Sequence, residues 1–208
     1  HMMSNFLNSF SKFFILLSII LIVVAGVLII FLENDYYQGI SFKIMFIHVP
    51  AAWLSLMIFF SMGISSVIGL IFKSPTSFTI SRSLSPVGLI MSIIVLITGS
   101  VWGNLTWGTY WVWDARLTSM LILAFIYLGH LFLLYSFEHF QKADFAASIL
   151  AIIGMVNIPI VKFSVDWWTT LHQGSSVFKI SGPSMTTDYF ITLMVSFFAI
   201  LLLSLYWF

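Results

Sequence analysis

Six long apolar runs without Asp, Glu, Lys or Arg constrain this chain more than any other feature of its sequence. Each run is close to the ~20 residues that an α-helix needs to cross the hydrocarbon core of a bilayer. We therefore predict an all-α polytopic membrane protein, with a single six-helix membrane domain over residues 3–208. The predicted spans cover about residues 13–32, 45–72, 84–102, 117–137, 145–161 and 189–208.

The composition agrees with a surface that faces lipid. Hydrophobic residues make up 61% of the chain and charged residues only 7%, whereas soluble domains carry about 25% charged residues. The net charge of +1 and the lack of a basic stripe argue against nucleic-acid binding. Cysteine is absent, which excludes disulfides and thiolate ligands and leaves histidine as the natural soft ligand.

The N-terminus has two features that bear on the first span. His1-Met2 resembles a cloning remnant before Met3. The first apolar run is longer than the core of a signal peptide, and no small-x-small cleavage site follows it. We expect a retained membrane span.

With six spans, the loops alternate between two membrane faces. One face, called side one, holds both termini and the loops 73–83 and 138–144. The opposite face, called side two, holds the loops 33–50, 103–116 and 162–188, and it carries the tryptophan cluster and two histidines. The eight Lys and Arg residues divide equally between the faces, so charge does not set the orientation.

The loop between spans three and four is rich in tryptophan. Four of the eight tryptophans lie between Trp102 and Trp113, and a single tryptophan there is typical of an interfacial aromatic belt. If the segment after Gly108 is helical, Trp107 and Trp111 share one face and form a flat apolar shelf that suits a planar macrocycle. Gly103 and Gly108 would let the backbone approach such a ligand.

Two charged residues follow the tryptophans. Asp114 stands where span four begins, so it can cap that helix with Arg116 as its local ion-pair partner. Alternatively, the planar donor fork of Arg116 can hold a carboxylate such as a porphyrin propionate.

Four histidines are candidates for chemistry. His48 lies at the entrance of span two, where we expect Pro50 in the first turn, and His172 lies in the longest side-two loop. Both can be ordinary interfacial polar residues, or together they can form a bis-histidine iron site. His130 is near the middle of span four, where it can hydrogen-bond to a serine-rich neighbouring helix. His139 is most simply a solvated side-one residue.

The segment 107–118, WGTYWVWDARLT, resembles the signature of the haem-handling WWD membrane proteins. Within them the chain is most similar to the CcmC family, the haem exporter C proteins of cytochrome c maturation System I. The stretches 48–53, HVPAAW, and 167–174, WWTTLHQG, support the resemblance, which runs from about residue 45 to 175. One departure is residues 104–106, where relatives often carry a Lys-Pro pair.

The resemblance implies a function and its residues. It implies that the tryptophan loop faces the periplasm, or the intermembrane space of mitochondria, from the inner membrane. There the protein would bind haem b and load it onto the haem chaperone CcmE, in a lyase-like role alongside CcmA, CcmB and CcmD. The implied axial ligands are His48 and His172, and the implied platform with its polar edge is Trp107, Trp111, Trp113, Asp114 and Arg116.

Two other functions remain open from the residues. An electron-transfer cytochrome b usually places its histidine ligands within spans, whereas His48 and His172 lie at span margins. A permease for haem or another substrate needs polar groups along a path at mid-depth. Apart from His130 and Asn157, the spans offer mainly serine and threonine for such a path.

Overall fold

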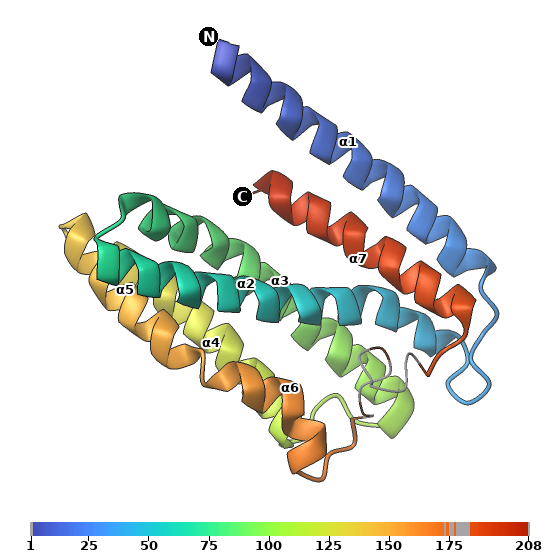
Figure 1. The fold of residues 1–208 in the computed structure, drawn as a ribbon. Helices are drawn as coiled ribbons and strands as arrows, with labels where there is room; N and C mark the ends of the chain where they lie inside the picture. The colour runs from blue at the N-terminus through green and yellow to red at the C-terminus, as the bar shows by residue number, and fades with distance from the viewer. Residues whose placement is uncertain (1, 173, 175–176, 178–183, 208) are drawn as a thin grey trace. The chain divides into compact units, whose positions relative to one another are not determined.

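The computed structural model describes residues 2–172, 174, 177 and 184–207. His1 and Gln173, named above, lie outside these residues. The described chain is helical and forms no strand (Figure 1). Its elements are α1 (Met2–Phe31), the 3-10 helix η1 (Ile40–Ile44), α2 (Met45–Phe72), α3 (Pro75–Trp107), α4 (Ala115–Tyr135), α5 (Phe140–Gly154), α6 (Asn157–Trp167) and α7 (Thr187–Trp207).

Six helical stretches of the described chain are long and apolar enough to cross a membrane. The 3-10 helix η1 continues into α2 as one of them, and α5 with α6 forms another. The prediction of an all-α, six-span membrane protein is confirmed. The chain divides into two compact units. One consists of residues 1–51 and 175–208, and the other of residues 52–174. The single-domain organisation stays a prediction.

The helices extend beyond the apolar runs. In α3, Ser74 caps the N-terminus by accepting a hydrogen bond from Ser77 N at 3.3 Å, and Pro75 occupies the first turn. The helix therefore begins well before the predicted start at residue 84. As a result, Arg82 and Asp144, which the sequence analysis placed in side-one loops, lie inside α3 and α5.

The fifth span is broken into two helices. We predicted one uninterrupted run over 145–161, but α5 ends at Gly154 and α6 begins at Asn157. Pro159 lies in the first turn of α6. Because its ring cannot fit against the carbonyl of Met155 in a continuous helix, the chain breaks just before it. Figure 1 shows α5 and α6 in succession beside α4.

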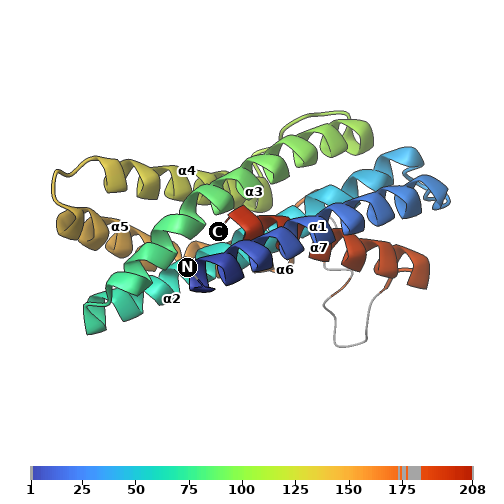
Figure 2. The ribbon, with the colours of Figure 1, turned by 90° about the horizontal axis from the view of Figure 1, so that it is seen from above.

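In the first compact unit, α1 and α7 pack along each other (Figures 1 and 2). The buried Ser18 hydroxyl of α1 donates to the Ala199 carbonyl of α7 at 2.9 Å. Near the other end of the pair, Tyr189 Oη donates to the Glu33 carbonyl at 3.0 Å. Helices in lipid gain little from apolar contact alone. The two hydrogen bonds therefore set how α1 and α7 are aligned along each other.

In the second compact unit, α4 packs against α3, α5 and α6. Tyr127 of α4 is fully buried, and its hydroxyl donates to the Ser55 carbonyl of α2 at 2.6 Å. A Cβ atom on Gly88 of α3 would lie 2.2 Å from the Tyr127 ring. Only glycine at residue 88 therefore allows this close approach of α3 and α4.

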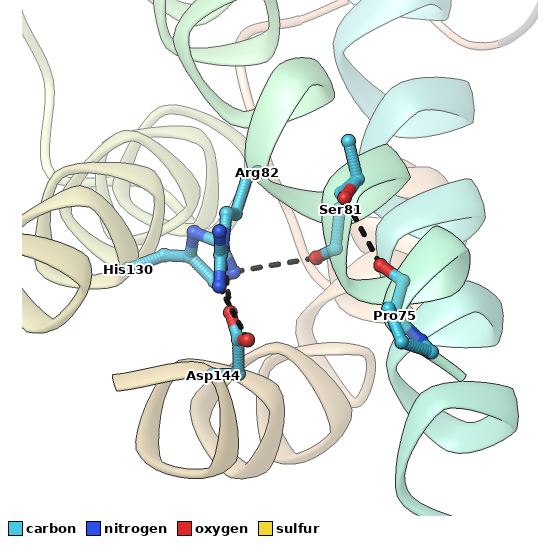
Figure 3. A network of polar contacts seen from close by, with 6 residues as sticks. Pro75, Ser81, Arg82, His130 and Asp144 are labelled. Atoms are coloured by element: carbon cyan, nitrogen blue, oxygen red, sulfur yellow. Dashed lines mark hydrogen bonds and ion pairs between the residues drawn. The ribbon is translucent and has the colours of Figure 1, made fainter. Parts of the chain in front are cut away.

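A polar cluster joins α3, α4 and α5 in the same unit (Figure 3). His130 Nδ1 lies 3.0 Å from Ser85 Oγ, and Nε2 lies 3.4 Å from Ser81 Oγ. The expectation that His130 pairs with a serine-rich neighbouring helix is confirmed. Beside it, Arg82 binds the carboxylate of Asp144 at two points. His139 is exposed, as expected.

Candidate functional site

The tryptophan loop begins at a left-handed glycine. The last residue of α3 is Trp107, and Gly108 adopts φ 77° and ψ 12° while its N–H donates to the Asn104 carbonyl at 3.1 Å. This is a helix cap that glycine adopts with little strain. The chain is not helical between Gly108 and Asp114. The expectation that Trp107 and Trp111 share one helical face is therefore wrong, because the left-handed residue turns the chain away from the helix axis.

The Trp107 ring folds back onto its own helix. A Cβ atom on Gly103 would lie 3.2 Å from the ring, so the space beside this glycine is filled by Trp107 rather than left for a flat ligand. The ring of His172 lies edge-on to Trp107, with 6.2 Å between centroids and 65° between planes. The structure thus brings together the loop before α4 and the loop after α6.

Two threonines brace these loops in the same way. Thr109 Oγ1 accepts from Trp111 N at 3.4 Å and donates to the Trp111 carbonyl at 3.1 Å. Thr170 Oγ1 accepts from His172 N at 3.1 Å and donates to the His172 carbonyl at 3.2 Å. In each turn the hydroxyl satisfies both backbone groups of the residue two positions later. The residues held in this way are two of the predicted site residues.

The indoles of Trp111 and Trp113 form an edge-to-face pair, with centroids 5.4 Å apart and planes at 77°. Trp113 is 76% exposed. The Nε1 atom of Trp111, by contrast, is buried without a hydrogen-bond partner in the described chain. A buried N–H without a partner is costly, so this donor is suited to a ligand acceptor.

Asp114 caps α4, as predicted. Its Oδ1 accepts from Leu117 N at 2.8 Å, and its Oδ2 is buried without a partner in the described chain. The expected ion pair with Arg116 is not formed among the described residues. Arg116 turns instead to α6, where Nε donates to Ser164 Oγ at 3.0 Å and Nη2 to the Lys162 carbonyl at 3.2 Å. The side chain of Arg116 is therefore bonded to α6 and not to the carboxylate two residues before it.

His48 lies in the first turn of α2, in the first compact unit. Helix α2 begins at Met45, so Pro50 is inside the helix and not in its first turn as we expected. The turn that carries His48 is fixed by aromatic contacts. Tyr189 of α7 lies 5.0 Å from Phe42 and 6.4 Å from Phe46, between ring centroids. The other predicted site residues belong to the second compact unit, and a shared iron for His48 and His172 stays a prediction.

Sequence reasoning missed the supporting residues of this region. Thr109 and Thr170 were visible in a repeated pattern, a threonine two residues before a predicted site residue. Ser164 had no such signal, because its partner Arg116 is distant in the sequence. Asn157 was noted only as a polar residue within a span, yet its Nδ2 donates to the Ser119 carbonyl of α4 at 2.8 Å.

The sequence profile of the family CcmC, heme exporter protein C, matches residues 1–208. The chain belongs to the heme exporter protein C family. Family members similar to it include heme exporter protein C of Bradyrhizobium diazoefficiens, 45% identical over 170 residues that make up 82% of this chain and 65% of that protein. Heme exporter protein C of Escherichia coli K12 is 45% identical over 175 residues, 84% of this chain and 70% of its own length.

A protein of Marchantia polymorpha is also similar to this chain. A "cytochrome c biosynthesis ccmC-like mitochondrial protein" of Marchantia polymorpha is 51% identical over 144 residues, 69% of this chain and 60% of that protein. The matched part thus spans less than two thirds of the Bradyrhizobium and Marchantia proteins.

Proposed function

We propose that this chain binds haem b on the side-two face and presents it to the haem chaperone CcmE during cytochrome c maturation. The names of its relatives, heme exporter protein C and cytochrome c biosynthesis ccmC-like protein, support haem handling. The structural observation that carries the proposal is Trp111 Nε1 in the tryptophan loop, which is buried and has no hydrogen-bond partner among the described residues. A porphyrin presents both an aromatic plane and two carboxylates, and this loop offers rings together with unused donors.

The donors of the loop fit a carboxylate-bearing ring. Trp111 Nε1 supplies one N–H. Arg116 uses Nε and Nη2 toward α6, and the described contacts do not use Nη1. Arginine is well suited to carboxylates because its planar fork matches their geometry. Asp114 is an acceptor and does not bind an ionised propionate, so we assign it to capping α4 under the polar edge. We assign the apolar contacts with the porphyrin to the rings of Trp107, Trp111 and Trp113.

We assign the iron ligands to His48 and His172. Bound haem supplies an iron atom whose two axial positions accept imidazole nitrogens. His172 is suited to this role because its backbone is braced by Thr170 and its ring is held against Trp107. His48 is suited because α2 fixes its backbone in a helical first turn.

The competing function as a cytochrome b is less well supported. Such a protein needs a histidine inside the spans with a nitrogen available to iron. Both ring nitrogens of His130, the histidine within α4, lie within hydrogen-bonding distance of serine hydroxyls. This supports the assembly factor over the cytochrome.

We place the protein in the bacterial inner membrane, or the mitochondrial inner membrane, with side two extracytoplasmic and CcmA, CcmB and CcmD as its partners.

The test is the visible spectrum of the purified protein loaded with haem. We expect a low-spin bis-histidine spectrum that changes in His48→Ala and in His172→Ala, with partial recovery when imidazole is added. His139→Ala, an exposed histidine on side one, is the matched control and should keep the wild-type spectrum. Mixing loaded protein with purified CcmE should move haem to the chaperone. A normally folded protein that takes up no haem would refute the proposal.

A further inference from the structure

Arg116 is held at its guanidinium by a fully buried serine. Ser164 Oγ accepts from Arg116 Nε at 3.0 Å and donates its own proton to the Val161 carbonyl at 2.9 Å. Because the hydroxyl proton is committed to α6, the oxygen lone pairs are directed at Arg116. The Lys162 carbonyl takes a second donor, Nη2, at 3.2 Å. The side chain therefore has a single orientation set by α6.

The backbone of Arg116 is tied to the same helix by a second route. Ser119 Oγ donates to the Arg116 carbonyl at 3.1 Å, and Asn157 Nδ2 donates to the Ser119 carbonyl at 2.8 Å. Asn157 is the first residue of α6, directly after the break in the fifth span. The buried amide at the start of α6 thus bonds to the first turns of α4.

Fixing a long side chain in advance affects how it binds an anion. A free arginine loses rotamer entropy when it is immobilised by a ligand. Here that ordering takes place within the protein, through Ser164 and Lys162. The two bonds to α6 leave other N–H groups of the guanidinium unused, and they orient the guanidinium before any carboxylate arrives.

We propose that Ser164 and Asn157 are positioning residues, which hold Arg116 for the carboxylates of a porphyrin. The inference rests on the proposed function, because it needs a porphyrin ligand. Neither residue touches the ligand, and both act through Arg116. Their removal should therefore weaken only the part of binding that depends on carboxylates.

The experiment compares binding of haem with binding of haem dimethyl ester, in which both carboxylates are blocked. The quantity measured is the ratio of the two dissociation constants in detergent. We expect wild type to favour haem by about tenfold or more, as for one charge-assisted hydrogen-bonded pair. Arg116→Gln should lower the ratio about tenfold, leaving only the preference that Trp111 Nε1 provides. Ser164→Ala and Asn157→Ala should each lower it about threefold or more, with affinity for the ester unchanged.

Three controls separate positioning from general structural damage. Ser164→Thr keeps the hydroxyl and should restore the wild-type ratio. Ser164→Cys keeps the size with a weak acceptor and should behave like Ser164→Ala, even if the latter folds poorly. Ser148→Ala removes a buried serine of α5 and should change nothing. The same ratios are expected with metal-free protoporphyrin IX and its dimethyl ester, whose binding does not involve iron ligands.

The outcomes distinguish this inference from the function on which it rests. If wild type binds neither haem nor its ester, the proposed function and the inference both fail. If wild type and Arg116→Gln behave as expected but Ser164→Ala and Ser164→Cys keep the wild-type ratio, only the inference fails. Equal loss of affinity for haem and ester in Ser164→Ala would also overturn it, because that is the result of a purely structural role.

Discussion

Arg82 of α3 and Asp144 of α5 meet as a two-point ion pair, with Arg82 Nε 2.6 Å from Asp144 Oδ1 and Nη2 bonded to Oδ2. The Asp144 side chain is 10% exposed, so neither water nor salt fully screens the pair. Phe140 adds a ring 5.1 Å from the guanidinium carbon. The pair therefore ties α3 to α5 across 62 residues of sequence.

The first prediction concerns this ion pair. Asp144→Leu or Arg82→Met alone leaves one charge without its partner, and each should lower the free energy of unfolding by about 1–3 kcal/mol. The double variant should be more stable than either single variant, because no unpaired charge remains. Unfolding of the purified protein in mixed micelles measures all four free energies. Strictly additive losses would mean that the two side chains do not interact.

The second prediction concerns His130. Replacing it by Leu removes the partner of Ser85 Oγ and one partner of Ser81 Oγ, and should cost about 1–3 kcal/mol of unfolding free energy. The haem spectrum of the folded variant should match wild type. Loss of the low-spin spectrum in His130→Leu, with a normal spectrum in His172→Ala, would move the haem into the membrane and favour the cytochrome b function.

The third prediction concerns the close approach of α3 and α4. In Gly88→Ala the new Cβ would lie 2.2 Å from the Tyr127 ring, which is fully buried and bonded to Ser55. We expect a loss of about 1–3 kcal/mol in unfolding free energy. Gly26→Ala is the matched control, because no atom of the described residues lies within 4 Å of its Cβ. It should be neutral or stabilise α1 by up to about 1 kcal/mol. Equal effects of the two substitutions would contradict the packing argument.

The fourth prediction concerns the Trp111 indole. Trp111→Phe keeps an aromatic ring but removes Nε1, and should weaken haem binding about tenfold, the loss of one buried hydrogen bond. Trp113→Phe should weaken it less, because that side chain is 76% exposed. Titration of haem into each purified variant gives the affinities. Similar affinities for wild type and Trp111→Phe would show that the indole N–H does not contact the ligand.

The fifth prediction concerns topology. Single cysteines introduced into this cysteine-free chain at Tyr110 and Thr169 should react with a membrane-impermeant reagent from the periplasm. Cysteines at the exposed positions Thr76 and Glu138 should not, because an odd number of spans separates the two sets of loops. Labelling of positions 110 and 138 from the same side would rule out the six-span arrangement.

Hydropathy and length sufficed to predict the number of spans and the helical class. The cap at Asp114 was predictable because a helix N-terminus is a local feature. The pairing of His130 was also predictable, because a buried imidazole must find polar neighbours. The break before Pro159 was also predictable from the sequence, because proline disrupts a helix at the preceding residues. The absence of charge predicts a span but does not show whether its helix is continuous.

The remaining features depend on contacts that are distant in the sequence. Arg116 bonds to Ser164 and Arg82 to Asp144, and one sequence offers no means of pairing residues so far apart. The direction of Trp107 was missed for another reason. Its ring position follows from the left-handed Gly108 and the gap at Gly103, and spacing along an assumed helix describes neither.

The threonine-braced turns at Thr109 and Thr170 have a kinetic consequence for the haem transfer that we propose. Because each hydroxyl already satisfies the backbone of Trp111 or His172, neither turn has to refold when a ligand enters or leaves. Under the proposed function, the activation barrier for release would then be set by the contacts of side chains with haem and not by a rearrangement of the two turns. Tight capture and rapid handover would thus be compatible, because the backbone at Trp111 and His172 needs no rearrangement for either step.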